Sequence, residues 1–307
     1  MNKHTVFLRQ GDPYVYLFVM GEWYCYDPMS QPLGSGAMGT VYMGYRVKDA
    51  TPMAVKRVKD AYSNNPMIRE RARQEASLAF RHNNLVEMIG YCEYAPTTGP
   101  IFLVSKFVAG KNIDEYARLF LNGSDRVEKI CNVIFQVLDA LEYIHSRGVI
   151  HRDIKPSNIM VEEDSNIRLM DLGIARMNDG NQFSQYGFIG TPQYAAPEQI
   201  LRGKTRAVQI NAATDLYALG ITFYEILTGS NPFDADTEVD TLTRQMRQPL
   251  PPDDSIPKRI MNVIAKATEK EQSRRYQTAA EFRTALTEAL QPPKSIFHRF
   301  KDWIGLN

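Results

Sequence analysis

The chain is organised around one polar stretch, which reads His151-Arg152-Asp153-Ile154-Lys155-Pro156-Ser157-Asn158. Apolar residues border it at 149–150 and 159–161, so the pattern predicts a short loop held at each end by a buried strand. A carboxylate fixed in such a loop can accept a proton, a nearby lysine can meet negative charge, and an amide oxygen can bind a hard cation. The stretch is the candidate catalytic centre, although an ordinary polar loop whose Asp caps a turn is the alternative.

The composition is that of a soluble globular chain, with 307 residues, 44% of them hydrophobic and 23% charged. This length suits one large domain or two lobes that share a core. The net charge of +1 predicts no nucleic-acid partner. Cys25, Cys92 and Cys131 show neither metal spacing nor a disulfide pattern, which favours a reducing cytoplasm. No secretory signal is expected, and the longest apolar run, 14–20, is too short to cross a bilayer.

Strand patterns fill the beginning of the chain. Residues 5–8 and 14–19 alternate around a turn signal at 10–13, which predicts a hairpin within an extension at 1–29. A glycine-rich stretch follows, and it reads Leu33-Gly34-Ser35-Gly36-Ala37-Met38-Gly39-Thr40-Val41. Glycines allow tight bends and let backbone amides approach phosphates. Because no helix follows, the pattern favours a strand–turn–strand over a dinucleotide-binding unit.

Lys56 lies in the next predicted strand, 52–58. Its spacing from Gly39 suits two antiparallel strands, which would return the lysine beneath the glycines; an exposed strand lysine is the ordinary alternative. The pattern at 64–80 is helical and strongly charged. One acid on this helix is expected to pair with Lys56. We choose Glu75, because an apolar turn follows it, with Glu70 as the alternative.

Further strands are predicted at 85–89 and 101–104. The alternation stops over 105–110, which indicates a hinge between a strand-rich lobe, ending at about 105, and a helical lobe, starting at about 109. Amphipathic or strongly apolar patterns predict helices at 113–121, 127–147, 215–227, 237–247, 257–270 and 277–290.

Asp171 follows the predicted strand 167–170 and precedes Leu172-Gly173. An aspartate at a strand end, next to a glycine, is well placed for Mg²⁺, although a turn Asp is the ordinary alternative. Residues 174–189 lack periodicity and predict a loop. After Pro292-Pro293, the tail 292–307 carries aromatic residues at helical spacing. Segment 294–307 would suit a membrane surface or a partner, but its shortness favours docking on the chain's own surface.

Five of these motifs together resemble the signature set of protein kinases. They occur in the family's order over about residues 30–290, and they read Gly34-x-Gly36-x-x-Gly39-x-Val41, Ala54-Val55-Lys56, His151-Arg152-Asp153 to Asn158, Asp171-Leu172-Gly173 and Ala196-Pro197-Glu198. Segment 190–199 looks most like the bacterial eukaryotic-like (Hanks-type) serine/threonine kinases. The resemblance implies an α+β, two-lobed fold over 30–291, with an antiparallel-sheet N-lobe carrying one helix and a mainly helical C-lobe.

The resemblance also implies ATP and Mg²⁺ as cofactors, and roles for single residues. Asp153 would accept the proton of the substrate hydroxyl, Lys155 would steady the transferring phosphoryl group, and Asn158 and Asp171 would hold the metal. The implied nucleotide-binding residues are Leu33, Gly34, Ser35, Gly36, Ala37, Met38, Gly39, Thr40, Val41, Ala54, Lys56, Glu75, Lys106, Val108 and Met160. Two further residues would support the site, Glu198 by pairing with Arg275 and Asp215 by bracing the catalytic loop.

Lys155 and Thr191 point to protein substrates with serine or threonine hydroxyls, because the family's tyrosine kinases usually lack the lysine. A nucleotide-binding pseudokinase is disfavoured by the complete set Lys56, Asp153, Asn158 and Asp171. A small-molecule phosphotransferase is disfavoured by Ala196-Pro197-Glu198. The chain departs from the family in Leu172, where phenylalanine is usual, in a short segment 75–82 and in an expected insertion near 202–209.

Regulation is a separate hypothesis. In kinases with an arginine before the catalytic aspartate, a phosphate on the following loop commonly pairs with that arginine. Arg152 occupies this position, and Ser184 is the best-placed acceptor, since Thr191 is expected to lie beside Asp153 and Lys155. We therefore hypothesise that Ser184 is autophosphorylated, against the alternative that it is merely a loop serine.

Overall fold

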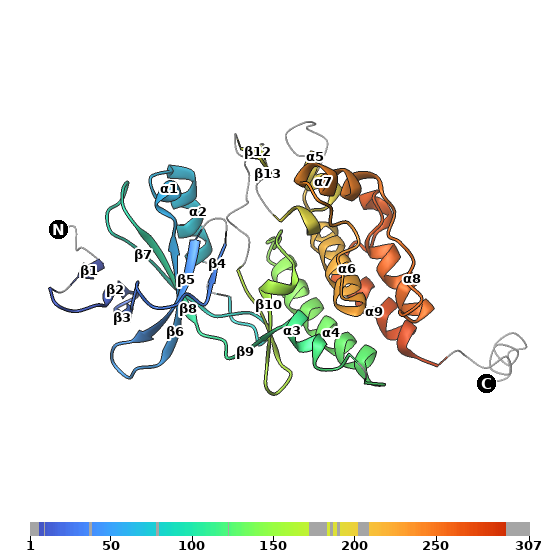
Figure 1. Cartoon of the computed structure of the whole chain (residues 1–307), viewed down its shortest axis with the longest axis horizontal. Helices are drawn as coiled ribbons and strands as arrows, with labels where there is room; N and C mark the ends of the chain where they lie inside the picture. The colour runs from blue at the N-terminus through green and yellow to red at the C-terminus, as the bar shows by residue number, and fades with distance from the viewer. Residues whose placement is uncertain are drawn as a thin grey trace, which may run out of the picture.

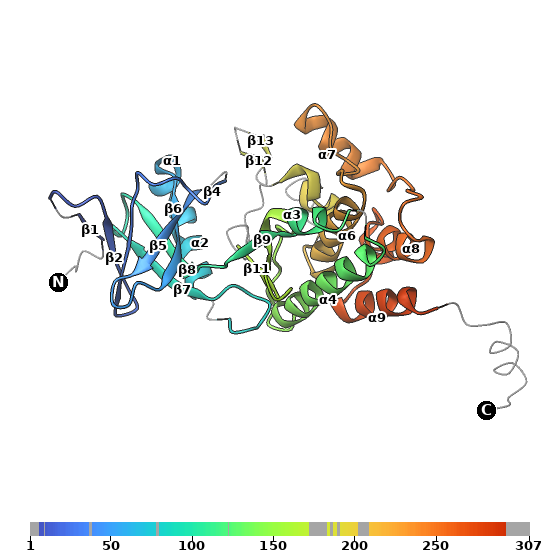
Figure 2. The same cartoon turned by 60° about the horizontal axis from the view of Figure 1, so that its bottom comes forward.

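The computed structural model describes residues 6–8, 10–36, 39–77, 80–121, 123–171, 183–184, 187–188, 191–201 and 209–292, without the side chains of 71, 75, 183, 184, 187 and 188. Strands dominate the first part of the chain and helices the second, and the two lobes lie side by side (Figures 1 and 2). The chain crosses from one lobe to the other between β8 (Ile101–Lys106) and β9 (Gly110–Asn112), where the hinge was predicted.

The N-lobe is an antiparallel sheet with the strand order β1-β2-β3-β5-β6-β8-β7, and β4 pairs with β5 off this path. The strands are β1 (Val6–Leu8), β2 (Val15–Val19), β3 (Glu22–Tyr26), β4 (Gly34–Ser35), β5 (Gly39–Arg46), β6 (Pro52–Val58), β7 (Met88–Glu93) and β8. The predicted N-terminal hairpin is confirmed by the β1–β2 pairing. The extension is also part of the lobe, because β3 pairs with β5.

Both faces of this sheet are covered. Ile68 and Ala72 of α2 (Pro66–Ser77) pack against Ile101 and Leu103. On the other face, strands of the extension contribute to a second apolar cluster, in which Leu17 and Val55 are fully buried. A short helix, α1 (Asp60–Ser63), precedes α2. The described N-lobe therefore has one short helix more than the single helix that was expected.

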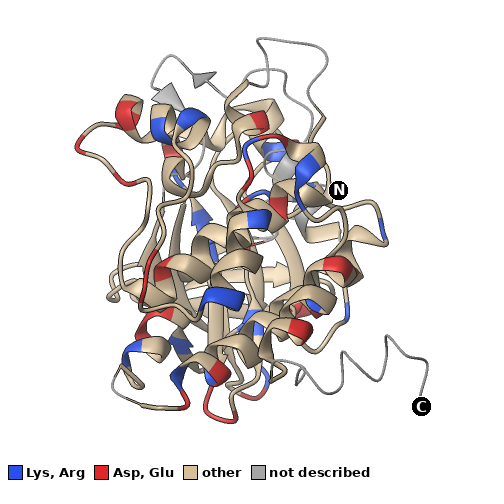
Figure 3. Cartoon of the chain, turned by 90° about the vertical axis from the view of Figure 1, so that its right-hand side faces the viewer, with Lys and Arg blue, Asp and Glu red and all other residues tan. Residues whose placement is uncertain are grey.

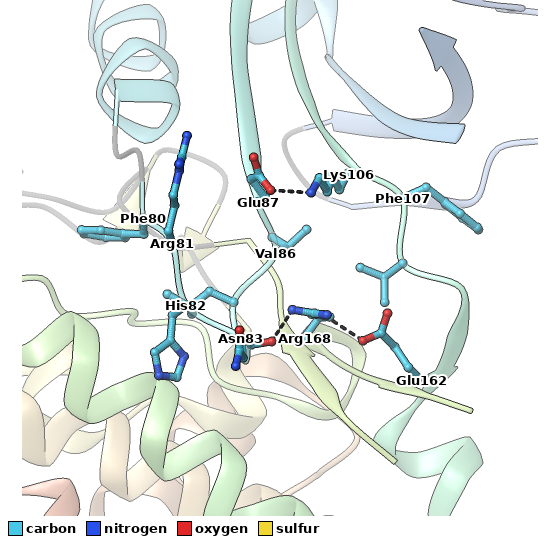
Figure 4. A pocket seen from close by; sticks show the side chains of 12 residues that line it. Phe80, Arg81, His82, Asn83, Val86, Glu87, Lys106, Phe107, Glu162 and Arg168 are labelled. Carbon is cyan, nitrogen blue, oxygen red and sulfur yellow. Dashed lines mark hydrogen bonds and ion pairs between the residues drawn. The ribbon is translucent and has the colours of Figure 1, made fainter. Parts of the chain in front are cut away.

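The predicted strand 85–89 was wrong in its bounds, because β7 runs from Met88 to Glu93. Leu85 instead forms an isolated bridge with Leu169, and the Val86 amide donates to the Leu169 carbonyl at 3.0 Å. These two apolar residues therefore attach the N-lobe to the C-lobe. Figure 4 shows this junction around a cavity of about 530 Å³, where Arg168 pairs with Glu162 and Lys106 with Glu87.

The C-lobe begins with a small sheet of β9, β10 (Ile159–Glu162) and β11 (Ile167–Leu169), in the order β11-β10-β9. Its helices are α3 (Ile113–Arg118), α4 (Arg126–His145), α5 (Pro197–Leu201), α6 (Ala212–Thr228), α7 (Glu238–Arg247), α8 (Lys258–Ala267) and α9 (Ala279–Leu290). Short 3-10 turns lie at η1 (Pro156–Asn158), η3 (Pro192–Tyr194) and η4 (Gln272–Arg274). A two-stranded ribbon, β12 (Phe183–Ser184) with β13 (Gly187–Phe188), completes the described elements.

Helix α6 is the centre of this lobe. It is buried over most of its length and packs against α4 and α8, as expected for a helix that is apolar on nearly all sides. Asn211 and Thr214 form a capping box at its start, and Gly229, with a φ of 84°, ends it in the left-handed conformation. Asp215 in its first turn is therefore held on a rigid and buried support.

Figure 3 shows the ribbon from the α8 side, where acidic and basic residues are interspersed along the described segments. No helix in the described ranges is both long enough and apolar enough to span a membrane.

Candidate functional site

The catalytic-loop stretch is fixed by one buried carboxylate. Asp215 is fully buried, and it accepts hydrogen bonds from the backbone amides of His151 at 2.8 Å and Arg152 at 2.7 Å. The His145 ring nitrogen Nε2 lies 2.8 Å from the same carboxylate. The predicted bracing role of Asp215 is thus confirmed, and the loop is held from α6.

The ionisation of these buried groups follows from their surroundings. Burial alone would raise the pKa of Asp215, but the hydrogen bond from His145 and the neighbouring histidines hold that pKa below its ordinary value. Burial lowers the pKa of His151, although Asp215 and Asp153 act against it. Asp215 is therefore the charged member of this group, and its charge is used to orient two backbone amides.

Asp153, Lys155, Asn158 and Thr191 meet at one point. The Asp153 carboxylate lies 3.1 Å from the Lys155 ammonium, and it accepts hydrogen bonds from the Thr191 hydroxyl at 3.2 Å and the Asn158 amide at 3.2 Å. The Thr191 hydroxyl also accepts from Lys155 at 2.9 Å. The expected place of Thr191 beside Asp153 and Lys155 is confirmed. A hydroxyl group can thus be held against this carboxylate, which is what a general base requires.

The glycine-rich stretch and Lys56 lie in one row across the sheet. Val41 pairs with Gly34 on one side and with Lys56 on the other, so the side chains of Val41 and Lys56 share a face. That face is turned to the C-lobe, because the Lys56 ammonium lies 3.0 Å from the Asp171 carboxylate. The prediction that two antiparallel strands return Lys56 beneath the glycines is confirmed.

The glycines of this stretch are required for different reasons. A Cβ atom added to Gly39 would lie 2.7 Å from the Arg57 carbonyl oxygen, so the sheet itself excludes a side chain there. A Cβ added to Gly34 or Gly36 would meet no atom of the described residues within 4 Å. Since neither has a positive φ, internal packing does not explain these two glycines, and the close approach of a phosphate to their backbone stays a prediction.

We therefore expect two alanine substitutions to change different properties, the stability at Gly39 and the KM for ATP at Gly36. Gly39→Ala forces a clash with backbone and should lower the free energy of unfolding by about 1 to 3 kcal/mol. Gly36→Ala should change it by less than about 0.5 kcal/mol but raise the KM for ATP severalfold. Urea unfolding and steady-state kinetics on both variants measure this. Equal destabilisation by the two substitutions would contradict our interpretation of the glycines.

The predicted adenine-binding residues lie on both lobes. The Leu33 amide donates to the Val41 carbonyl at 2.8 Å, Ala54 pairs with Ser105 of β8, and Met160 lies on β10. The Lys106 amide donates to the Glu87 carbonyl at 2.9 Å, which leaves only its carbonyl for an adenine. No described residue accepts a hydrogen bond from the Val108 amide.

Several predicted site residues lie outside the description. Ala37 and Met38 are not described, nor are Leu172, residues 202–208 of the expected insertion and the tail from 293. Glu75 lies on α2, but its side chain is not described, and the same holds for Ser184 on β12. The alternative acid, Glu70, contacts Arg73 at 3.5 Å and Gln74 at 3.2 Å, both on its own helix. Neither contact connects Glu70 to Lys56.

A buried ion pair supports the segment that follows Thr191. The Arg275 guanidinium contacts the two oxygens of Glu198 at 2.7 and 2.9 Å, and both side chains are almost completely inaccessible. This confirms the predicted pair. Gln199, from the same helix α5, donates to the Arg152 carbonyl at 3.2 Å, so α5 is joined directly to the catalytic loop.

Comparisons with known proteins agree with this geometry. The family model described as the protein kinase domain matches residues 28–289. The chain belongs to the protein kinase family. It is 32% identical over 274 residues to serine/threonine-protein kinase PknB of Mycobacterium leprae, covering 86% of this chain and 43% of the relative. It is 34% identical over 269 residues to PknB of Mycolicibacterium smegmatis, covering 84% of this chain and 42% of the relative.

Serine/threonine-protein kinase PknH of Mycobacterium bovis is a third relative, 31% identical over 266 residues, which cover 85% of this chain and 43% of PknH. The chain thus spans less than half of the length of the curated relatives that it matches. The crystal structure of the Mycobacterium tuberculosis PknI kinase domain superposes with a TM-score of 0.64 at 23% identity, covering 89% of this chain and 98% of that one. This structural match shows that the fold is shared.

The donor set of this kinase fits a magnesium ion held together with phosphate. The Asn158 amide nitrogen donates to the Asp153 carbonyl at 2.8 Å, which fixes the orientation of the amide and leaves its oxygen as a free hard ligand. The Asp171 side chain is 45% exposed. No group of three or more His, Cys, Asp or Glu in the described part could hold a metal by itself. One carboxylate and one amide oxygen suit Mg²⁺ when phosphate oxygens complete the shell.

Two residues contribute to this site that the sequence did not predict. His145 was not expected at the site, yet it contacts Asp215. The role of Gln199 was not foreseen. Positive φ values mark the site as well. Of the five non-glycine residues with positive φ in the described part, three lie in hairpin turns, whereas Arg152 and Asp171 lie at the site. Such strained conformations persist where the surroundings enforce them.

Proposed function

We propose that this chain transfers the γ-phosphoryl group of ATP to serine and threonine hydroxyls of protein substrates. The observation that carries the proposal is the contact of the Asp153 carboxylate with both the Lys155 ammonium, at 3.1 Å, and the Thr191 hydroxyl, at 3.2 Å. A substrate hydroxyl that takes the place of the threonine hydroxyl would lie within reach of the base. The names of the curated relatives support the serine/threonine class.

The chain's own residues divide the work of this reaction. Asp153 orients the substrate hydroxyl and accepts its proton, while Lys155 brings positive charge to the same place. Lys56, anchored between β5 and β8, reaches toward the phosphate side of the site. Asn158 and Asp171 would hold Mg²⁺, which neutralises phosphate charge when bound. Most of the rate acceleration is then positioning and electrostatic stabilisation by a fixed loop.

Labelled ATP tests the proposal directly. The purified chain is incubated with γ-labelled ATP, Mg²⁺ and myelin basic protein, and the labelled amino acids are identified after acid hydrolysis. We expect label on phosphoserine and phosphothreonine, and autophosphorylation of the chain. Nucleotide binding without transfer to any protein would overturn the proposal, and label on phosphotyrosine alone would overturn the serine/threonine class.

The regulatory hypothesis on Ser184 remains a proposal that is separate from the activity. The backbone of Ser184 pairs with Gly187 in the β12–β13 ribbon, which precedes Thr191 in the chain. Mass spectrometry of active protein should find phosphate on Ser184, and Ser184→Ala should slow transfer severalfold. Fully active protein with an unmodified Ser184 would contradict the hypothesis.

A further inference from the structure

A directed chain of hydrogen bonds runs through the C-lobe toward the catalytic centre. It starts at Lys270, which follows α8, and its ammonium donates to the Tyr217 hydroxyl on α6 at 2.7 Å. That hydroxyl donates to the side-chain oxygen of Gln245 on α7 at 2.6 Å. The amide nitrogen of Gln245 then donates to the backbone carbonyl of Gln193 in η3. Three elements that are distant in sequence are therefore linked to one backbone carbonyl.

The direction of this chain is set by Lys270. In its charged form Lys270 has no acceptor, so the Tyr217 hydroxyl then gives its single proton to Gln245. The Gln245 oxygen then faces Tyr217, and its amide nitrogen faces Gln193. Tyr217 and Gln245 are both fully buried, so water cannot replace a lost partner without a rearrangement.

The position of Lys270 is unusual for a lysine. Its ammonium lies 3.8 Å from the centre of the buried Phe233 ring and 5.1 Å from that of Tyr217. Burial and the nearby Arg275 lower the pKa of Lys270 to about 7, although Glu269 acts in the other direction. A surface lysine would avoid this cost, so a retained contact with Tyr217 requires an explanation.

The Gln193 end of the hydrogen-bond chain explains this contact of Lys270 with Tyr217. Gln193 lies in η3, which begins directly after Thr191, whose hydroxyl donates to Asp153 at 3.2 Å and accepts from Lys155 at 2.9 Å. Segment 191–194 is thus held by the catalytic residues on one side and by Gln245 on the other. Asn231 donates to the same Gln193 carbonyl at 3.3 Å, so the backbone conformation there rests on two side-chain amides.

We propose that Lys270, Tyr217 and Gln245 are positioning residues that hold segment 191–194 in the conformation that receives the protein substrate. The proposal rests on the proposed function, because it concerns how a protein substrate is presented to Asp153. These residues act through the Gln193 backbone and do not touch the reacting groups. Their effect therefore belongs to the binding of the protein substrate and not to the binding of ATP.

Kinetics of Lys270→Met, Tyr217→Phe and the double variant test the proposal with myelin basic protein as substrate. We expect each single variant to raise the KM for that protein about fivefold to tenfold, the change that one net hydrogen bond makes. The KM for ATP and the kcat should stay within about twofold of the parent. The double variant should have the same KM for the protein substrate as either single variant, because one broken link already interrupts the hydrogen-bond chain.

Lys266→Met is the matched control. Lys266 lies on α8, and its ammonium is 4.5 Å from the centre of the Tyr276 ring, a contact that does not involve segment 191–194. It should leave every kinetic constant unchanged. The melting temperature of each variant is measured in parallel, and Lys270→Met alone decides the question if Tyr217→Phe fails to fold.

The outcomes separate this proposal from the proposed function. A parent chain that transfers no phosphate refutes the function, whatever the variants do. An active parent whose variants keep their KM for the protein substrate refutes the positioning role alone. The same holds if the KM for ATP rises equally, if losses in the double variant add, or if all constants fall in step with the melting temperature.

Discussion

Asp153→Asn is expected to slow phosphoryl transfer by two to three decades while the fold is kept. The asparagine has the shape of the aspartate but keeps one acceptor oxygen, so it can accept from Lys155 or from Thr191, which contact different oxygens of Asp153. It can neither take a proton nor carry a charge. Losing one such transition-state contribution plausibly costs about 3 to 4 kcal/mol. The Asp153 side chain is 15% exposed and contacts polar groups, so no apolar packing is lost.

Single-turnover rates at saturating Mg-ATP, together with thermal unfolding, measure this effect. Asp164→Asn is the control, because Asp164 is exposed in the β10–β11 turn and its carboxylate accepts hydrogen bonds from neighbouring Asn166. The control should keep the parent rate. A rate for Asp153→Asn within about tenfold of the parent would show that another group serves as the base.

The sequence predicted the parts of this site that depend on local pattern. The Gly39–Lys56 spacing was sufficient because antiparallel strands joined by a short connection have one simple geometry, and the observed Val41–Lys56 pairing follows from it. The catalytic loop was found because its polar residues interrupt two apolar strands. Asp215 and Arg275 could be assigned only through the resemblance, since their partners lie far away in the sequence.

The remaining features depend on tertiary contacts that no local pattern carries. Leu85 and Val86 have the composition of a strand, but the Val86 amide donates to the Leu169 carbonyl of the other lobe and the Leu85 amide donates to the His82 carbonyl. Lys270 stands between two glutamates and has the pattern of a solvated charge. Its burial follows from the Tyr217 and Phe233 rings, which the chain brings in from other elements.

Breaking the Glu198–Arg275 pair is expected to have the largest effect on stability. The side chains are 6% and 0% exposed, and two short hydrogen bonds join them. Glu198→Gln leaves the Arg275 charge buried without a counter-charge, and removing one partner of such a pair costs about 3 to 5 kcal/mol. Arg275→Met should cost a similar amount, because it leaves the carboxylate unpaired.

The double variant Glu198→Met with Arg275→Met separates a buried charge from lost packing. Two apolar side chains of suitable volume often replace a buried ion pair at little cost, so the double variant should be more stable than either single one in urea unfolding. Glu271→Gln is the control, since the Arg274–Glu271 pair of the same region is 69% and 58% exposed and should contribute little. Additive losses in the double variant would mean that Glu198 and Arg275 act through separate contacts, Glu198 through Thr214 and Arg275 through the Glu269 carbonyl.

Because Glu198 follows segment 191–194 and shares α5 with Gln199, the single variants should also lose activity. The double variant should recover stability without recovering the fixed position of α5.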